Sequence, residues 1–258
     1  MPLASMIAPP PDPAFFTRDD GVRLAYRFAE GAGPLLVFLP GYKSDMGGGK
    51  AQAVFAYARA SGQACLLLDY SGCGLSDGRF EDGTLVLWRD DALALIRYLW
   101  PERAVLPIGS SMGGWLALLL ALQMPERVAG VIGIAAAPDF TAWGFSDAQK
   151  IALQTYGRLI EPSDYDDEGY VTTLAFWQSG EANRLLEGEI PLDCPVRFLH
   201  GQADGVVPWE VAVRAAVRLR TQDVQLMLIK DGDHRLSREA DIMLLLGLVD
   251  GLLAAVAS

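Results

Sequence analysis

The chain has 258 residues, 51% of them hydrophobic, which is enough for one large globular domain and excludes a disordered chain. Its 32 acidic and 21 basic residues give a net charge of -11, which repels phosphate backbones and argues against a nucleic-acid partner. Three widely spaced cysteines form neither a disulfide framework nor a zinc-ligand pattern. No stretch reads as a signal peptide or a membrane span. We therefore expect a cytoplasmic protein with no metal and no cofactor.

The predicted elements alternate between short apolar runs and amphipathic stretches. In chain order the first seven are strand Leu35–Leu39, helix Lys50–Ser61, strand Ala64–Leu68, helix Thr84–Trp100, strand Ala104–Ile108, helix Gly114–Met124 and strand Val128–Ile134. The last four are strand Val196–His200, helix Glu210–Leu219, strand Val224–Ile229 and helix Arg238–Val256. Repeated strand–helix units predict an α/β protein with a mainly parallel central sheet flanked by helices.

The segment from Pro138 to Pro191 interrupts this alternation. It has no clear strand, and helical patterns cover Phe145–Ile160 and Val171–Ser179. We therefore predict a helical cap at residues 138–191, inserted into a core of residues 1–137 and 192–258.

Aromatic side chains of this cap are candidates for lining an apolar acyl or aryl pocket, although packing of the cap onto the core is the competing explanation. The candidates are Trp143, Phe145, Phe176 and Trp177. An acidic run of Asp164, Asp166, Asp167 and Glu168 is typical of a solvated loop; at the pocket entrance it would disfavour anionic substrates.

A nucleophile motif lies between a predicted strand and a predicted helix. Gly109-Ser110-Ser111-Met112-Gly113 matches G-x-S-x-G, in which the serine occupies a strained turn at the end of the strand. The following helix directs its free N–H groups toward the oxyanion that develops on the substrate. The motif alone is weak, but this position between strand and helix favours Ser111 as a nucleophile.

A serine nucleophile needs a base, and the chain has two histidines, His200 and His234. In α/β-hydrolases the triad runs in the order serine, acid, histidine along the chain, so His234, after the last predicted strand, fits the base. His200 ends a strand, where we expect a structural hydrogen bond.

The acid of the triad is expected after the predicted strand Val196–His200. Asp204 occupies this place and would hold the imidazole of His234 in one tautomer. Asp139, after an earlier strand, is its rival.

The second oxyanion donor is expected in the loop after the first long strand. Leu39-Pro40-Gly41-Tyr42 occupies this place, so we predict an oxyanion hole from the backbone N–H groups of Tyr42 and Met112.

Two other glycine-rich stretches do not match the motifs of nucleotide-binding loops. Gly47-Gly48-Gly49-Lys50 lacks the first glycine and the Ser/Thr of a P-loop, and Gly72-Cys73-Gly74 has its third glycine one residue late.

Several motifs resemble known α/β-hydrolases. Asp69-Tyr70-Ser71-Gly72-Cys73-Gly74-Leu75-Ser76 resembles their D-x-x-G-x-G-x-S segment. More specifically, the chain is similar to the family of mitochondrial acyl-protein thioesterases also described as mycophenolic acid acyl-glucuronide esterases. The segments that carry this similarity are Leu39-Pro40-Gly41-Tyr42, Gly109-Ser110-Ser111-Met112-Gly113-Gly114-Trp115, Leu199-His200-Gly201, Val207-Pro208-Trp209 and Asp233-His234-Arg235.

The resemblance implies the α/β-hydrolase fold and a triad of Ser111, Asp204 and His234. It also implies activities of the family: removal of acyl groups from protein cysteines and hydrolysis of acyl glucuronides. The first sixteen residues contain no arginine, so no mitochondrial presequence is evident, and we expect a bacterial relative.

We expect a serine hydrolase that cleaves carboxylic esters or thioesters through an acyl-enzyme, acting on a small acyl ester or thioester or on an acylated protein. Amidase, C–C hydrolase and perhydrolase chemistry use the same triad and stay open. A non-catalytic binding protein of the same fold is the alternative from another class. A dehalogenase is disfavoured because it would carry Asp at position 111.

Overall fold

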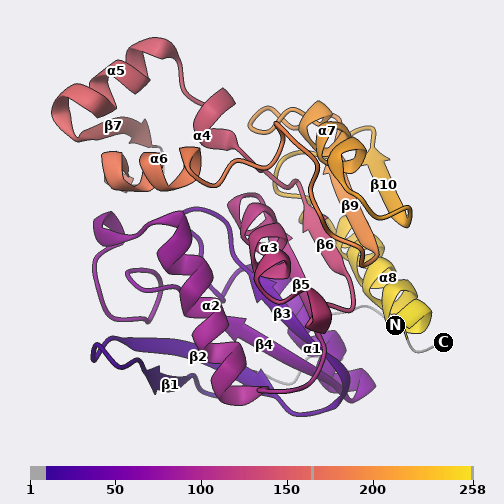
Figure 1. The fold of residues 1–258 in the computed structure, drawn as a ribbon. Helices are drawn as coiled ribbons and strands as arrows, with labels where there is room; N and C mark the ends of the chain where they lie inside the picture. Colours follow the sequence, from indigo (N-terminus) through magenta and orange to yellow (C-terminus); the bar gives the residue numbers. More distant parts are fainter. Residues whose placement is uncertain (1–9, 164–165, 257–258) are drawn as a thin grey trace.

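The structure is a computed structural model that describes residues 10–163 and 166–256. Its centre is one eight-stranded sheet in the order β1-β2-β4-β3-β5-β6-β9-β10 (Figure 1). The strands are β1 (Ala14–Thr17), β2 (Arg23–Ala29), β3 (Ala32–Leu39), β4 (Gln63–Leu68), β5 (Val105–Ser110), β6 (Val131–Ile134), β9 (Val196–Gly201) and β10 (Val224–Ile229). All neighbours from β4 to β10 pair in parallel, whereas β1 and β2 form an antiparallel edge.

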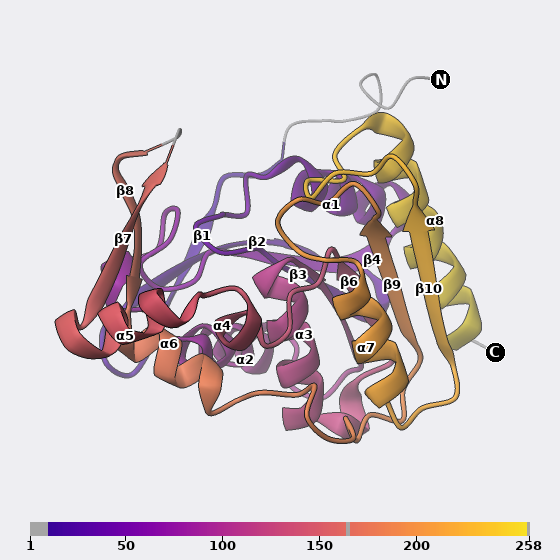
Figure 2. The ribbon, with the colours of Figure 1, turned by 90° about the horizontal axis from the view of Figure 1, so that it is seen from above.

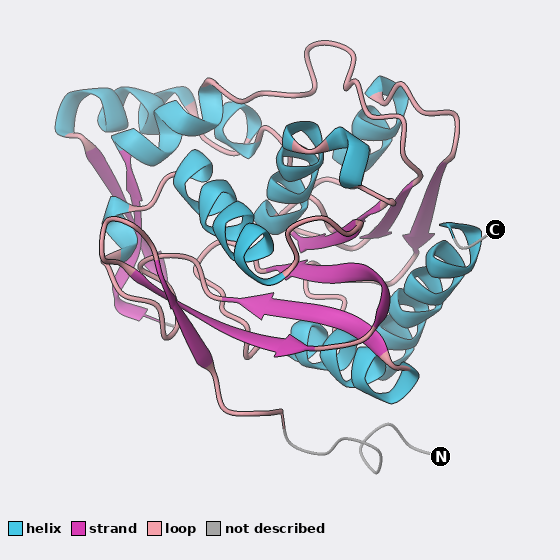
Figure 3. Ribbon diagram, turned by 60° about the horizontal axis from the view of Figure 1, so that its bottom comes forward, coloured by secondary structure: helices cyan, strands magenta, loops and turns pink. Residues whose placement is uncertain are grey.

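Helices cover both faces of this sheet (Figure 3). One face carries α2 (Leu85–Leu99), α3 (Met112–Gln123) and α7 (Glu210–Arg218), and the other carries α1 (Gly49–Ser61) and α8 (Glu239–Val256). Side chains that alternate along the strands pack into a hydrophobic cluster on each face of the sheet. Leu35, Val37 and Leu39 of β3 lie in the cluster under α2, α3 and α7, and Leu36 and Phe38 lie in the cluster under α1 and α8. No helix within residues 10–163 and 166–256 is long and apolar enough to cross a membrane.

The predicted all-helical cap is wrong in one respect, because this segment contains an antiparallel β-hairpin. Helices α4 (Phe140–Trp143), α5 (Asp147–Tyr156) and α6 (Leu174–Glu181) accompany strands β7 (Arg158–Ser163) and β8 (Asp166–Thr173). The predicted helix Phe145–Ile160 ends early at Gly157, whose φ of 75° closes the last turn of α5. Figure 2 shows this group of elements beside the sheet rather than within it.

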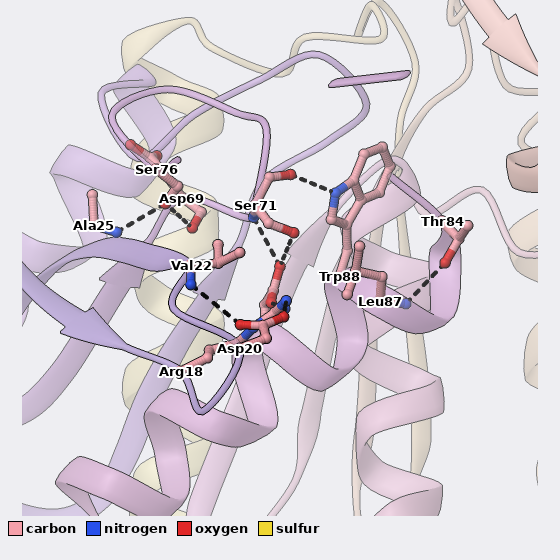
Figure 4. Close-up of polar contacts among 11 residues, drawn as sticks. Arg18, Asp20, Val22, Ala25, Asp69, Ser71, Ser76, Thr84, Leu87 and Trp88 are labelled. Atoms are coloured by element: carbon pink, nitrogen blue, oxygen red, sulfur yellow. Dashed lines mark hydrogen bonds and ion pairs between the residues drawn. The ribbon is translucent and has the colours of Figure 1, made fainter. Parts of the chain in front are cut away.

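The loop after β4 is fastened to α2 by buried polar groups (Figure 4). The Ser71 N–H and hydroxyl both donate to Asp91, which also pairs with Arg18 from the segment after β1. The Trp88 indole N–H donates to the Ser71 carbonyl at 3.0 Å. The D-x-x-G-x-G-x-S segment is therefore a compact turn held by internal hydrogen bonds. Within it the Asp69 carboxylate accepts from the N–H of Leu75.

Candidate active site

Ser111 lies in the sharp turn between β5 and α3. Its φ of 56° and ψ of −119° are unusual for a residue with a side chain, and such strain concentrates at functional sites. The turn needs its glycines, because a Cβ on Gly109 would lie 1.9 Å from the carbonyl oxygen of Gly113. A Cβ on Gly113 would lie 2.0 Å from the carbonyl oxygen of Leu39 in the neighbouring strand. The sequence GSSMG thus folds as the strained elbow expected of a nucleophile.

The structure brings His234 and Asp204 together from two loops at the same edge of the sheet. His234 Nδ1 lies 2.8 Å from Asp204 Oδ2, and the other carboxylate oxygen accepts from the N–H groups of Val206 and Val207 at 2.8 Å each. Burial by itself would raise the pKa of Asp204. The hydrogen bonds from His200, His234 and the two backbone groups outweigh it and hold this pKa well below its usual range. Asp204 is therefore a charged acceptor for His234.

His200 lies behind this pair rather than beside the serine. Its side chain is fully buried, and its Nε2 lies 3.0 Å from the carbonyl oxygen of Val207. The structural hydrogen bond expected at this position is therefore present. The same Nε2 lies 3.4 Å from Asp204 Oδ2.

The other carboxylates near the site have different partners. Asp139 accepts from the N–H groups of Leu185 and Leu186 at 2.7 and 2.8 Å, which ties the start of the cap to its end. Burial raises the pKa of Asp139 in spite of these bonds. Asp233 accepts from the Leu236 N–H within its own loop. The geometry thus favours Asp204 over these rivals as the partner of His234.

The loop after β3 lies against the nucleophile, as the oxyanion prediction requires. A Cβ on Gly41 would be 3.4 Å from the Cβ of Ser111, so glycine allows the two backbones to approach closely. Tyr42 and Met112 line the same cavity as Ser111. The Tyr42 hydroxyl donates to the Val171 carbonyl of β8 at 3.0 Å, and its ring contacts those of Phe176, Phe80 and Trp88. The loop after β3 is therefore also attached to the cap.

A cavity of about 630 Å³ opens beside Ser111 and His234. Of the four aromatic side chains predicted to line it, Trp143 and Phe145 do so. The prediction is wrong for the other two. Phe176 is 1% exposed and packs in the aromatic core, and the Trp177 indole donates to the Thr141 carbonyl. The sequence could not tell the aromatic residues that line the cavity from those that pack in the core. That difference depends on which face of each cap element meets the core.

The cavity also has lining residues that sequence reasoning missed: Ser44, Lys50, Glu161, Val206 and Arg235. The Lys50 ammonium donates to the Arg235 carbonyl, and burial lowers the pKa of Lys50.

The side chains of the predicted acidic run, Asp164 and Asp166 to Glu168, lie outside the described part of the structure. Within the described residues no group of His, Cys, Asp and Glu side chains has the arrangement of a metal site. Burial raises the pKa of Cys73 to about 12 and of Cys194 to about 11, so neither is an activated thiol.

Comparison with known proteins agrees with this geometry. A model of the alpha/beta hydrolase family matches residues 36–249, so this chain belongs to that family and is a hydrolase. It is 40% identical over 244 residues to the human mitochondrial palmitoyl-protein thioesterase ABHD10, covering 93% of this chain and 79% of the relative.

Two solved structures resemble it over nearly the whole chain. Mouse alpha/beta hydrolase domain-containing protein 10 superimposes with a TM-score of 0.87 at 38% identity, covering 95% of this chain and 99% of that one. A putative hydrolase from Agrobacterium vitis S4 also gives a TM-score of 0.87, at 36% identity, covering 94% of this chain and 98% of that one.

Proposed function

We propose that this protein is a serine hydrolase that cleaves carboxylic esters or thioesters through an acyl-enzyme. The observation that carries the proposal is the strained elbow of Ser111 in a cavity shared with His234, whose Nδ1 is paired with Asp204. With Nδ1 engaged, Nε2 of His234 is the nitrogen left to take the serine proton. The 40% identical human relative is a palmitoyl-protein thioesterase, which supports the thioester class and an acylated protein as substrate.

In this mechanism Ser111 Oγ attacks the acyl carbon while His234 takes its proton. The oxyanion is held by the backbone N–H groups of Tyr42 and Met112, and His234 then returns the proton to the departing alcohol or thiol. Water, whose proton His234 takes, next attacks the acyl carbon. The bond to Ser111 Oγ then breaks, His234 returns the proton to Oγ, and the carboxylic acid leaves. Trp143 and Phe145 present apolar surface for the acyl chain. The cytoplasmic localisation predicted from the sequence stays a prediction.

The test uses a fluorophosphonate probe, which reacts with activated serines. Intact-mass analysis is expected to show one adduct, located on Ser111, and Ser111→Ala is expected to show none while unfolding at the same temperature. A folded wild type without an adduct contradicts the proposal. A panel of p-nitrophenyl esters and acyl thioesters of graded length then identifies the preferred leaving group and chain length.

A further inference from the structure

His200 is a buried histidine that the proposed mechanism does not use. Its side chain comes from β9 and is 0% exposed. Its Nε2 faces the Val207 carbonyl at 3.0 Å and Asp204 Oδ2 at 3.4 Å. Both of these oxygens only accept hydrogen bonds, because one is a carbonyl and the other a carboxylate held in its ionised form. Nε2 must therefore carry a hydrogen.

The other ring nitrogen has the opposite environment. His200 Nδ1 is buried and has no hydrogen-bond partner among the described residues. A hydrogen on Nδ1 would make the ring a buried cation with an unsatisfied donor, which costs more than leaving a lone pair unsatisfied. The geometry therefore places a ring hydrogen on Nε2 and gives Nδ1 none to share.

The single N–H of this ring reaches two points of one loop. Asp204 and Val207 are three residues apart, and Asp204 Oδ1 already accepts from the N–H groups of Val206 and Val207. The ring joins this turn to β9 and approaches the same oxygen, Oδ2, that His234 contacts at 2.8 Å. Among the described residues, two titratable side chains contact the Asp204 carboxylate: His200 from β9 and His234 from the loop after β10.

We infer that His200 is a positioning residue for the catalytic acid: as a fixed Nε2–H donor it holds Asp204 in the orientation that serves His234. This inference rests on the proposed function, because it assigns His200 a role only if Asp204 and His234 work on Ser111. It also has an electrostatic consequence. A carboxylate that loses a donor attracts protons more strongly, and it then stabilises the protonated form of its remaining partner, His234. Loss of the His200 donor should therefore move the acidic limb of the reaction to higher pH.

Three substitutions separate the two nitrogens. His200→Phe removes both, but the loss of Nδ1 breaks no hydrogen bond. His200→Gln places an amide N–H near the position of Nε2, and His200→Asn places one near the position of Nδ1. We expect the labelling rate with the fluorophosphonate probe to fall about tenfold in His200→Phe, the size expected for a hydrogen bond to a charged group. His200→Asn should behave alike, and His200→Gln should recover most of the rate.

The decisive readout is the labelling rate measured between pH 5 and pH 9. We expect the acidic limb to move to higher pH in the Phe and Asn variants and to return in the Gln variant. An unmoved limb in folded Phe or Asn variants overturns the inference, even with a lower rate, because a merely structural role would change stability only. If His200→Phe does not fold, the comparison of Gln with Asn decides. A wild type that is not labelled refutes the proposed function instead.

The tautomer is open to a direct measurement that needs no substrate. The chain has two histidines, so ¹⁵N-histidine labelling gives two rings to assign, with His234→Gln to identify the survivor. We expect the His200 ring to show a protonated Nε2 and a bare Nδ1 across the neutral pH range. A ring whose only hydrogen is on Nδ1 overturns the inference, because Nε2 could then not donate to Asp204.

Discussion

Hydrogen-bond donors distinguish the carboxylates around the cavity. Asp204 accepts from His234 and two backbone N–H groups, so its charge is both stabilised and directed at the imidazole. Asp139 accepts with its two oxygens from the backbone N–H groups of Leu185 and Leu186, and among the described residues its hydrogen-bond partners include no histidine. These two acids, each of which follows a strand of the sheet, thus have different partners: a histidine for Asp204 and the backbone of the cap for Asp139.

Replacement of these acids provides a matched comparison. In Asp204→Asn the amide can donate to His234 Nδ1 and so favour the wrong tautomer, and we expect a loss of about 10⁴-fold in kcat. Asp139→Asn should keep kcat within about tenfold of the wild type and lower the melting temperature, because the single amide oxygen can accept from only one of the two N–H groups and the amide NH2 then faces the other. Hydrolysis of a p-nitrophenyl ester and thermal unfolding measure both. An Asp139 variant as inactive as the Asp204 variant would contradict this assignment.

At the scale of elements, the site depends on how closely β3, β5 and α3 approach one another. Gly109, Gly113 and Gly41 lie where a Cβ would meet backbone atoms of these elements. Backbone atoms cannot move aside as a flexible side chain can, because each belongs to a paired strand or a helix. The elbow therefore tolerates only glycine at its tightest contacts.

A pair of alanine substitutions tests this constraint. Gly113→Ala would place a methyl group 2.0 Å from the Leu39 carbonyl oxygen, and we expect it to abolish folding or to lower the melting temperature by more than 10 °C, which is about 2.5–5 kcal/mol in a chain of this size. Gly247→Ala in α8 meets no atom within 4 Å and should raise stability by about 0.5–1 kcal/mol, because alanine is the better helix former. Equal melting temperatures for the two variants would show that the elbow is not tightly packed.

At the scale of the whole molecule, the cavity belongs to both the core and the cap. Ser111 and His234 come from the sheet edge, whereas Trp143 and Phe145 come from the segment inserted after β6. The cap is held by the Tyr42 hydroxyl on Val171 and by Asp139 on the backbone of Leu185. Substrate preference and cap stability should therefore depend on different aromatic residues of the same segment.

Two phenylalanines of the cap separate these properties. Phe145→Ala enlarges the cavity, and we expect kcat/KM to fall for long acyl chains with little change in stability. Phe176→Ala removes a ring that is 1% exposed, and it should lower the free energy of unfolding by about 3–5 kcal/mol. Ester hydrolysis over graded chain lengths and urea denaturation measure the two effects. A Phe145 variant with unchanged chain-length preference would remove this residue from the acyl site.

The predicted strands from residue 35 to the end correspond to β3, β4, β5, β6, β9 and β10 within a few residues. Continuous apolar runs mark the inner strands, which are buried on both faces, whereas β10 at the sheet edge alternates between partly buried and exposed residues. Strands β1 and β2 were missed. Arg23 and Arg27 interrupt the apolar pattern of β2, and β1 is a short, largely exposed strand at the edge of the sheet. The hairpin of β7 and β8 was missed because its hydrogen bonds come from a partner strand, which no local pattern reports.

The sequence by itself determined the candidates for the chemistry: a serine between two glycines after a buried strand, and an acid and a histidine in the order that the fold requires. These are local patterns, and the parallel sheet brings the carboxyl ends of its strands to one edge. Only the tertiary structure decided which carboxylate faces His234, which two aromatic side chains line the cavity, and that His200 lies behind Asp204. Those facts depend on contacts between segments far apart in the chain, where packing rather than local preference selects the partner.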